Sequence, residues 1–217
     1  MRQEPGCANQ PPMRTLAIDT ATEACSVALF DGATLIAARH EVLGRGHAER
    51  LVPLIAELPD RGRADRILVS LGPGSFTGTR IGIAAARALA LAWGAEVLGY
   101  PTLSLVAACA QAQLGPVPVT VVMNGGHGEW LMQAFDADGS PLGVHQSLPP
   151  ADAVELIVID NVAGSRAEEL AARRGSGRTL PMLPDACLAL TLPAASLTSR
   201  IAPIYARAPD AKPSADG

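Results

Sequence analysis

Apolar and polar residues follow two different patterns along this chain of 217 residues. Short apolar runs bounded by Gly, Pro, Asn or Asp predict strands, and longer segments with apolar residues three or four positions apart predict helices. The predicted strands are 16–18, 25–30, 34–42, 67–71, 96–100, 117–123, 129–135 and 156–159. The predicted helices are 47–58, 77–93, 102–113, 165–174 and 184–191. The strand at 117–123 ends at Asn124 much as the first strand ends at Asp19, which hints at a second domain built on the plan of the first.

The segment 66–94 predicts a strand, a tight loop and a helix in direct succession. The loop is dense in glycine, which permits close backbone approach, and Ser75 or Thr77 can cap the helix that follows. A helix N-terminus attracts anions, so the loop is a candidate for a weak anion or nucleotide site. The spacing matches neither G-x-x-x-x-G-K-[ST] nor G-x-G-x-x-G, so a sharp corner without a ligand is the alternative. The candidate loop residues are Gly72, Gly74, Ser75 and Thr77.

The first predicted strand ends at Asp19 in the sequence Asp-Thr-Ala-Thr. Actin-like ATPases use such a strand end, placed before a hairpin, to present a carboxylate and hydroxyls to a metal-phosphate group. Here Ala21 and Thr22 stand where the glycine that admits phosphate is expected. The alternative is therefore a turn in which Asp19 and the threonines satisfy local backbone donors.

The helix predicted over 77–93 carries small residues at every fourth position. Residues four apart share one helix face, so Gly78, Gly82, Ala86 and Ala90 form a nearly bare stripe over which another backbone can approach closely. Each glycine in a helix costs up to about 1 kcal/mol relative to alanine, so we expect close packing to offset that cost. The neighbour is either another part of this chain or a partner protein.

Composition narrows the class of protein. With 48% hydrophobic residues the chain can bury a sizeable core, and a net charge of −4 argues against a chain that binds nucleic acid by itself. The four cysteines show no paired spacing and are interpreted as cytosolic thiols, and the four histidines form no ligand cluster, so no metal is expected. No membrane span is expected, because no run of eighteen apolar residues occurs.

Four segments together resemble one protein family. They are LAIDTATEACSVAL at 16–29, HAERL at 47–51, SLGPGSFTGTRIG at 70–82 and PIYAR at 203–207. They are similar to the TsaB (YeaZ) family of bacterial tRNA threonylcarbamoyladenosine biosynthesis proteins. The resemblance is dense over 14–103 and thin afterwards, and the segment 70–82 is specific enough to identify the family alone.

The resemblance implies an α/β fold of the actin-like ATPase class (ASKHA, ribonuclease H-like) with two lobes, the second shortened. We expect an N-terminal lobe over 14–102 and a C-terminal lobe over 103–208. A disordered leader is expected over 1–13, with Met13 as an alternative start, and a disordered tail over 209–217.

The resemblance also implies a function. Family members work in the cytoplasm with the catalytic paralogue TsaD and the ATPase TsaE to transfer threonylcarbamoyl to N6 of the adenosine beside the anticodon. TsaD holds the metal and the active site, so this chain is expected to be a non-catalytic subunit. It is then expected to have no catalytic residue and no cofactor beyond weak nucleotide binding, and to meet tRNA only through the complex.

In the family, the first two helices of the N-terminal lobe pack against the same helices of the partner. The implied contact residues are His47, Leu51, Leu54, Ile55, Gly78, Gly82, Ala86 and Ala90. A homodimer through the same helices is possible for the free chain. The chain departs from the family at Asn124-Gly125-Gly126, where Asp-Ala-Arg is usual, which puts nucleotide contact in doubt.

Two other functions stay open. The first is an actin-like ATPase or small-molecule kinase that uses Asp19 and the loop 72–78. The second is a peptidase, although no Ser-His-Asp, Cys-His or metal pattern supports it.

Overall fold

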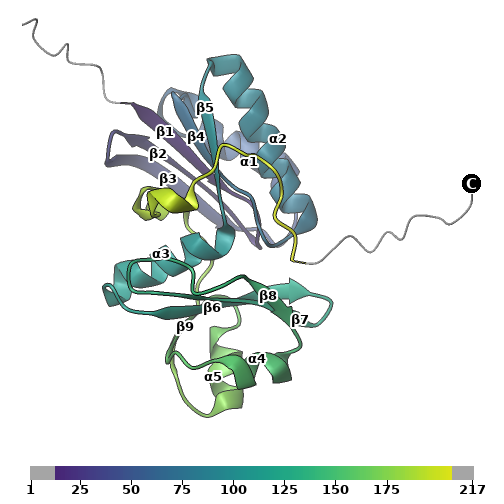
Figure 1. Cartoon of the computed structure of the whole chain (residues 1–217). Coiled ribbons are helices and arrows are strands. Elements are labelled where there is room, and N and C mark those ends of the chain that lie inside the picture. The colour runs from purple at the N-terminus through teal and green to yellow at the C-terminus, as the bar shows by residue number, and fades with distance from the viewer. Residues whose placement is uncertain (1–12, 207–217) are drawn as a thin grey trace, which may run out of the picture.

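The computed structural model describes residues 13–206, which form two five-stranded sheets (Figure 1). Apart from Met13, the predicted leader lies outside the described residues, as does the predicted tail at 209–217. None of the helices between residues 13 and 206 has the length and apolar content needed to cross a bilayer.

The first sheet has the strand order β3-β2-β1-β4-β5. Its central strand β1 pairs antiparallel with β2 and parallel with β4, and β5 continues the parallel side. Apolar residues alternate between the two faces, so that Leu16 and Ile18 pack on one side of the sheet and Ala17 on the other. The strands are β1 (Arg14–Asp19), β2 (Ala24–Asp31), β3 (Thr34–Val42), β4 (Arg66–Ser70) and β5 (Glu96–Tyr100).

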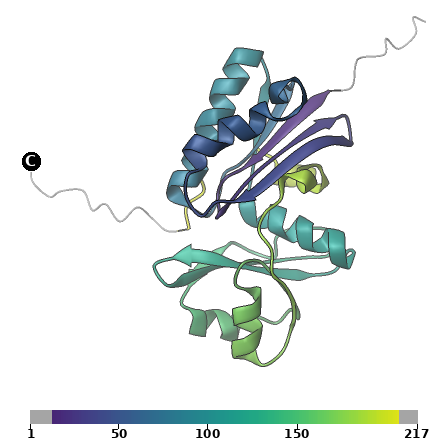
Figure 2. The same ribbon diagram turned by 180° about the vertical axis from the view of Figure 1, so that it is seen from behind.

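Two helices cover the outer face of this sheet, α1 (His47–Ala56) and α2 (Phe76–Trp93) (Figures 1 and 2). A short 3-10 helix, η1 (Pro59–Gly62), follows α1. We call this sheet with α1 and α2 the first lobe.

The second sheet repeats the plan of the first. Its order, read from the far edge, is β8-β7-β6-β9-β10, with β6 antiparallel to β7 and parallel to β9. The likeness noted between 117–124 and the first strand is thereby confirmed. The strands are β6 (Val119–Gly126), β7 (Glu129–Phe135), β8 (Gln146–Leu148), β9 (Asn161–Ala163) and β10 (Arg178–Leu180). Helices α4 (Pro150–Leu156) and α5 (Ala167–Arg174) cover its outer face, and we call this unit the second lobe.

Helix α3 (Thr102–Leu114) lies between the two sheets (Figure 1). One side packs against the first sheet through Leu105 and Cys109, and the other packs against the second sheet through Leu103 and Val106. A helix enclosed on both sides is apolar all round, and α3 accordingly contains no charged residue.

Two sequence predictions beyond residue 150 are wrong. The strand expected over 156–159 is absent: α4 ends at Leu156, Val158 is exposed, and the strand that follows is β9. The apolar run LIVI was ambiguous because short apolar runs do not separate helix ends from strands. The helix expected over 184–191 is the 3-10 helix η2 (Ala186–Thr191), begun by Asp185, whose side chain accepts a hydrogen bond from the Cys187 N–H.

After η3 (Ala194–Ser196) the chain returns to the first lobe as an extended segment, residues 197–206, which we call the C-terminal strap. It pairs with Gly99 through Thr198, and the Ile204 N–H donates to the Leu71 carbonyl at 2.7 Å. Figure 1 shows it crossing the front of α2. The strap therefore ties the end of the described chain to the first lobe.

Candidate functional site in the interlobe cleft

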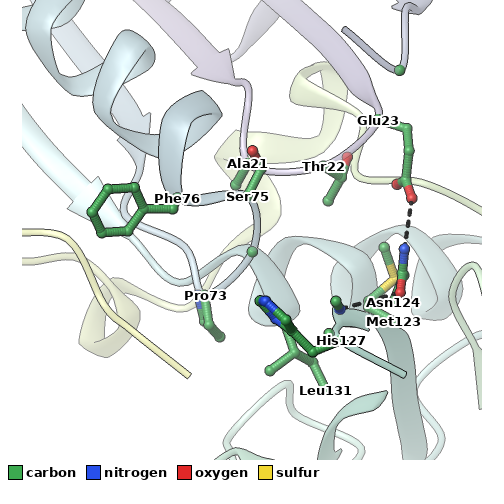
Figure 3. A pocket seen from close by; sticks show the side chains of 14 residues that line it. Ala21, Thr22, Glu23, Pro73, Ser75, Phe76, Met123, Asn124, His127 and Leu131 are labelled. Atoms are coloured by element: carbon green, nitrogen blue, oxygen red, sulfur yellow. Dashed lines mark hydrogen bonds between the residues drawn. The ribbon is translucent and has the colours of Figure 1, made fainter. Parts of the chain in front are cut away.

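A cleft of about 340 Å³ opens between the two lobes (Figure 3). The first lobe contributes the turn after β1 and the loop before α2. The second lobe contributes the end of β6 and the hairpin turn that follows it. The lining side chains labelled in Figure 3 are Ala21, Thr22, Glu23, Pro73, Ser75, Phe76, Met123, Asn124, His127 and Leu131.

The polar groups of the cleft are few and carry no fixed positive charge. The Asn124 amide donates to Glu23 across the two lobes at 3.5 Å, and its oxygen accepts from the Gly126 N–H at 3.2 Å. His127 stands at the hairpin turn with a φ of 51°. None of the described residues that line the cleft is Arg or Lys, so a polyphosphate would meet the Glu23 carboxylate without a cation to balance it.

The glycine-rich loop is filled by the chain itself. The Ser75 N–H donates to the Ala21 carbonyl at 2.6 Å, and the Thr20 hydroxyl donates to the Gly78 carbonyl at 2.7 Å. A Cβ at Gly74 would clash with the Ala21 carbonyl, and one at Gly78 would clash with that of Thr20. The glycines therefore make room for the backbone of the turn after β1. This turn fills the space in which an ATPase of this shape would bind phosphates.

Asp19 lies behind the cleft and is fully buried. Its carboxylate accepts from the Ala21 N–H at 3.0 Å, and the Tyr100 hydroxyl lies 3.4 Å from its second oxygen. Burial raises the pKa of the Asp19 carboxyl to about 7. Asp19 thus accepts a local backbone hydrogen bond within the turn after β1, which is the alternative to a metal-phosphate site that the sequence left open.

The structure separates the residues predicted for an anion or nucleotide site. Gly74 and Ser75 line the cleft, whereas Asp19 and Gly72 are buried and Thr77 is exposed on α2 outside it. Ser75 caps α2, as predicted, by accepting from the Gly78 N–H at 3.1 Å. Because the loop is filled and the cleft lacks a cation among its described residues, these residues do not fit a bound nucleotide.

The predicted partner contacts on α1 need a correction. His47, Leu51, Leu54 and Ile55 are all buried, and the last three belong to the core of the first lobe. The His47 Nε2 lies 3.1 Å from the Ala24 carbonyl oxygen. Their periodic spacing marks the inner face of α1, so they are covered by this chain.

The small-residue stripe of α2 needs the same correction. Gly78, Gly82, Ala86 and Ala90 are buried, and a Cβ at Gly82 would overlap the Thr20 side chain. The stripe thus lets α2 approach the sheet and the turn after β1, which is the intramolecular alternative. The periodicity correctly indicated close packing but not which neighbour supplies it.

The surfaces left open on α1 and α2 are their outer faces. Two large apolar side chains stand out there, Val52 at 58% exposure and Leu91 at 88%. Small residues accompany them: Ala48 and Ala56 lie four positions on either side of Val52 on α1, and Ala84 and Ala88 lie seven and three positions before Leu91 on α2. Sequence reasoning assigned contacts to the inner faces because the strongest apolar periodicity lies there.

A further cluster was missed because its members are far apart in the sequence. Arg80 lies over the Phe76 ring at 3.5 Å from its centroid, and its Nη2 donates to the Tyr205 hydroxyl at 2.9 Å. Tyr205 is contributed by the C-terminal strap. The only sequence signal was that both ends of this contact fall within the segments that carry the family resemblance.

Comparisons with known proteins agree with this architecture. A family model described as TsaD, tRNA N6-adenosine threonylcarbamoyltransferase, matches residues 39–186. The chain is 39% identical over 134 residues to the tRNA threonylcarbamoyladenosine biosynthesis protein TsaB of Escherichia coli K12, an alignment covering 58% of each. The chain spans about half the length of the curated relatives it matches.

Solved structures show the same fold. YeaZ from Pseudomonas aeruginosa superposes with a TM-score of 0.73 at 28% identity, covering 89% of this chain and 99% of that one. The ethanolamine utilization protein EutJ of Carboxydothermus hydrogenoformans superposes with a TM-score of 0.52 at 14% identity, covering 84% and 90%, which is a likeness of fold alone. The predicted two-lobed α/β fold of the actin-like class is confirmed.

Proposed function

Because the chain belongs to the tRNA N6-adenosine threonylcarbamoyltransferase family, and within it to the TsaB (YeaZ) proteins, we propose that it acts in threonylcarbamoyladenosine biosynthesis. In this proposal it is a non-catalytic subunit that binds and supports the catalytic paralogue TsaD. TsaD then transfers the threonylcarbamoyl group to the adenosine beside the anticodon. The complex acts in the cytoplasm, and tRNA reaches this chain only within it.

The exposed outer faces of α1 and α2 carry the proposal. The inner faces of both helices are buried in the core of the first lobe. The outer faces expose Val52 and Leu91 among small residues. Exposed apolar side chains set among alanines allow a second pair of helices to pack closely. We therefore assign the TsaD contact to these outer faces.

The chemistry of the cleft supports the non-catalytic role. The space under the glycine-rich loop is taken by the Thr20 and Ala21 carbonyl oxygens, and Asp19 is buried behind the turn. An actin-like ATPase or kinase needs both elements open to a metal-phosphate group, so the geometry disfavours that alternative.

Two further associations belong to this proposal. The ATPase TsaE would join the complex of the two paralogues. The free chain would form a homodimer through the same outer faces, which would then compete with TsaD for Leu91 and its neighbours.

Sedimentation of the chain with the TsaD paralogue of the same organism tests the proposal. The wild-type chain should form a heterodimer, and Leu91→Glu should weaken it at least about 30-fold, because a charge replaces a central apolar contact. Leu91→Glu leaves the core untouched, so the variant should fold normally.

Val158→Glu is the matched control, since Val158 is 86% exposed on the second lobe. This variant should bind like wild type. A wild-type chain that forms no complex with the paralogue, or equal weakening by both variants, would contradict the proposal.

A further inference from the structure

A second groove opens on the side of the first sheet opposite α1 and α2, where α3 and η2 pack. It has two adjoining sections, of about 440 and 330 Å³, which share His40, Met182 and Leu183. Val42 of β3 lines the first section, and the end of α3 lines the second. We call this hollow the β3 groove. It opens away from the helix faces assigned to TsaD.

The apolar side chains of the β3 groove are incompletely covered. Val42 is 67% exposed, and Met182 and Leu183 are half-buried. These three residues come from two segments that lie far apart in the sequence but border the same hollow. Exposed apolar side chains grouped around a concave surface are typical of a binding site for another protein.

Two carboxylates border the groove, Glu23 in the first section and Asp185 in the second. Neither has an ion-pair partner among the described residues. Their bonds come from neutral donors: the Asn124 amide donates to Glu23 at 3.5 Å, and the Cys187 N–H donates to Asp185 at 3.0 Å. None of the described residues that line the groove is Arg or Lys, so the two negative charges are not cancelled there.

The acids on the other face of β3 are paired within the chain. Arg50 of α1 forms ion pairs with Glu41 and Glu57. The β3 groove therefore differs from the α1 side of the same strand in having acids that are free to attract a positive partner. A second copy of this chain is a poor occupant, because its net charge is −4.

The groove lies along a strand whose second edge is open. β3 is the outer strand of the first sheet, and between residues 13 and 206 it pairs with β2 alone. That pairing runs in regular register from Ala37 to Val42, and β3 contains no proline. An edge strand with unpaired backbone groups can accept an added strand.

We propose that the β3 groove binds an extended, basic segment of a partner protein, which adds a strand to the edge of β3. Side chains two positions apart share one face of a strand, so the matching pattern is basic-x-aliphatic-x-basic. The aliphatic side chain packs against Val42 and Met182, and the basic side chains face Glu23 and Asp185. This contact goes beyond the proposed function and does not depend on it.

The test uses a fluorescein-labelled peptide with the sequence Lys-Thr-Val-Thr-Lys between Gly-Ser ends, and fluorescence anisotropy measures its binding to the full chain. Exchange of both lysines for glutamate should weaken binding at least about 10-fold, because like charges then meet. Alternate N–H groups of an extended strand point to the same edge. Methylation of one alternate set of peptide amides should therefore weaken binding at least about 10-fold, and methylation of the other set should have little effect.

Variants of the chain locate the site. Val42→Arg should weaken binding at least about 10-fold, because it places a like charge beside the peptide, and it should fold normally at so exposed a position. Val144→Arg is the matched control, since Val144 is 82% exposed in the second lobe. Glu23→Gln should weaken binding about 3-fold, whereas Glu168→Gln on α5 should not.

Equal binding of the two methylated peptides, or of the lysine and glutamate peptides, would overturn the proposal. Equal effects of Val42→Arg and Val144→Arg would do the same. Weaker self-association of Val42→Arg in sedimentation, without peptide binding to wild type, would assign the edge of β3 to a second copy and would also overturn it. None of these results bears on association with the TsaD paralogue, which is proposed to use the outer faces of α1 and α2.

Discussion

The two lobes share one strand plan but differ in the helices that cover it. In each, a central strand is flanked by an antiparallel hairpin on one side and parallel strands on the other. The first lobe carries α1 and α2 of 10 and 18 residues, whereas the second carries α4 and α5 of 7 and 8. The longer helices of the first lobe leave an outer face exposed. We propose that the boundary between the two lobes falls between residues 102 and 103.

The ends of the two central strands show where the lobes diverge. In both, the segment after the neighbouring parallel strand donates a backbone hydrogen bond to the central strand or to the turn that follows it. The Ser75 N–H donates to the Ala21 carbonyl, two residues beyond β1, and the Arg166 N–H donates to the Val122 carbonyl, inside β6, at 3.1 Å. Asp19 is sealed behind its loop, but the corresponding Asn124 is exposed in the cleft. Both lobes therefore have this backbone contact, which we call the interlock. Burial decides which strand end can contact a ligand, and only Asn124, in the second lobe, is exposed.

The largest effects should come from breaking that interlock in either lobe. We expect Gly78→Ala and Gly164→Ala each to lower the free energy of unfolding by about 3 kcal/mol or more, because each new Cβ meets a backbone carbonyl that cannot move aside. Chemical denaturation measures this.

Ala88→Leu, on the exposed face of α2, is the control and should change stability by less than about 0.5 kcal/mol. If only one of the two glycine variants is destabilised, the lobes do not share the interlock.

A pH titration should distinguish the two strand ends. The folded pKa of Asp19, about 7, lies above its ordinary value of 3.8, so the folded state holds a proton that the unfolded state has lost. The wild-type stability should therefore fall as pH rises from about 4 to 7. Relative to Asp19→Asn, it should fall by about 2 to 3 kcal/mol between about pH 5 and pH 8.

The control is Asn124→Ser in the second lobe. This change adds no titratable group, so the variant should track wild type across the same pH range. Equal pH profiles for Asp19→Asn and wild type would show that Asp19 is charged in the folded chain.

A smaller effect is expected on the affinity for the TsaD paralogue, and it should show which lobe's outer surface makes the contact. Val52→Glu on α1 should weaken association with the TsaD paralogue about 10-fold, because it places a charge in the proposed helix contact. Leu156→Glu on α4, where the side chain is 53% exposed, should have no effect. Calorimetric titration compares the two, and the reverse ranking would move the contact to the second lobe.

The smallest effect concerns the C-terminal strap, which packs on the first lobe. Tyr205→Phe keeps the ring contact with Phe76 but removes the hydroxyl that Arg80 donates to, so thermal unfolding should show a loss of about 0.5 kcal/mol. Tyr100→Phe is the contrasting variant, because its buried hydroxyl donates to Ile18 at 2.9 Å, and it should cost more. A larger loss at Tyr205 would mean that the strap stabilises the first lobe more than its hydrogen bonds suggest.

Much of the fold could be predicted from local pattern. The strands and helices of the first lobe, the cap at Ser75 and the likeness of the two central strands were all predicted correctly, because long periodic segments and turn residues carry that information. The three-residue strands β8, β9 and β10 were missed, since so few residues cannot establish a period. The strand assigned to 156–159 failed for the same reason.

The amino-acid sequence was sufficient to establish the family, through the segment 70–82, and to indicate which residues of α1 and α2 pack closely. What those residues pack against became clear only from the folded chain. Periodicity identifies a face that must be covered, but the covering group comes from distant residues: Thr20 lies over Gly78 and Gly82, and Tyr205 lies beside Arg80. Contacts between segments so far apart depend on how the strands assemble, and no local pattern encodes them.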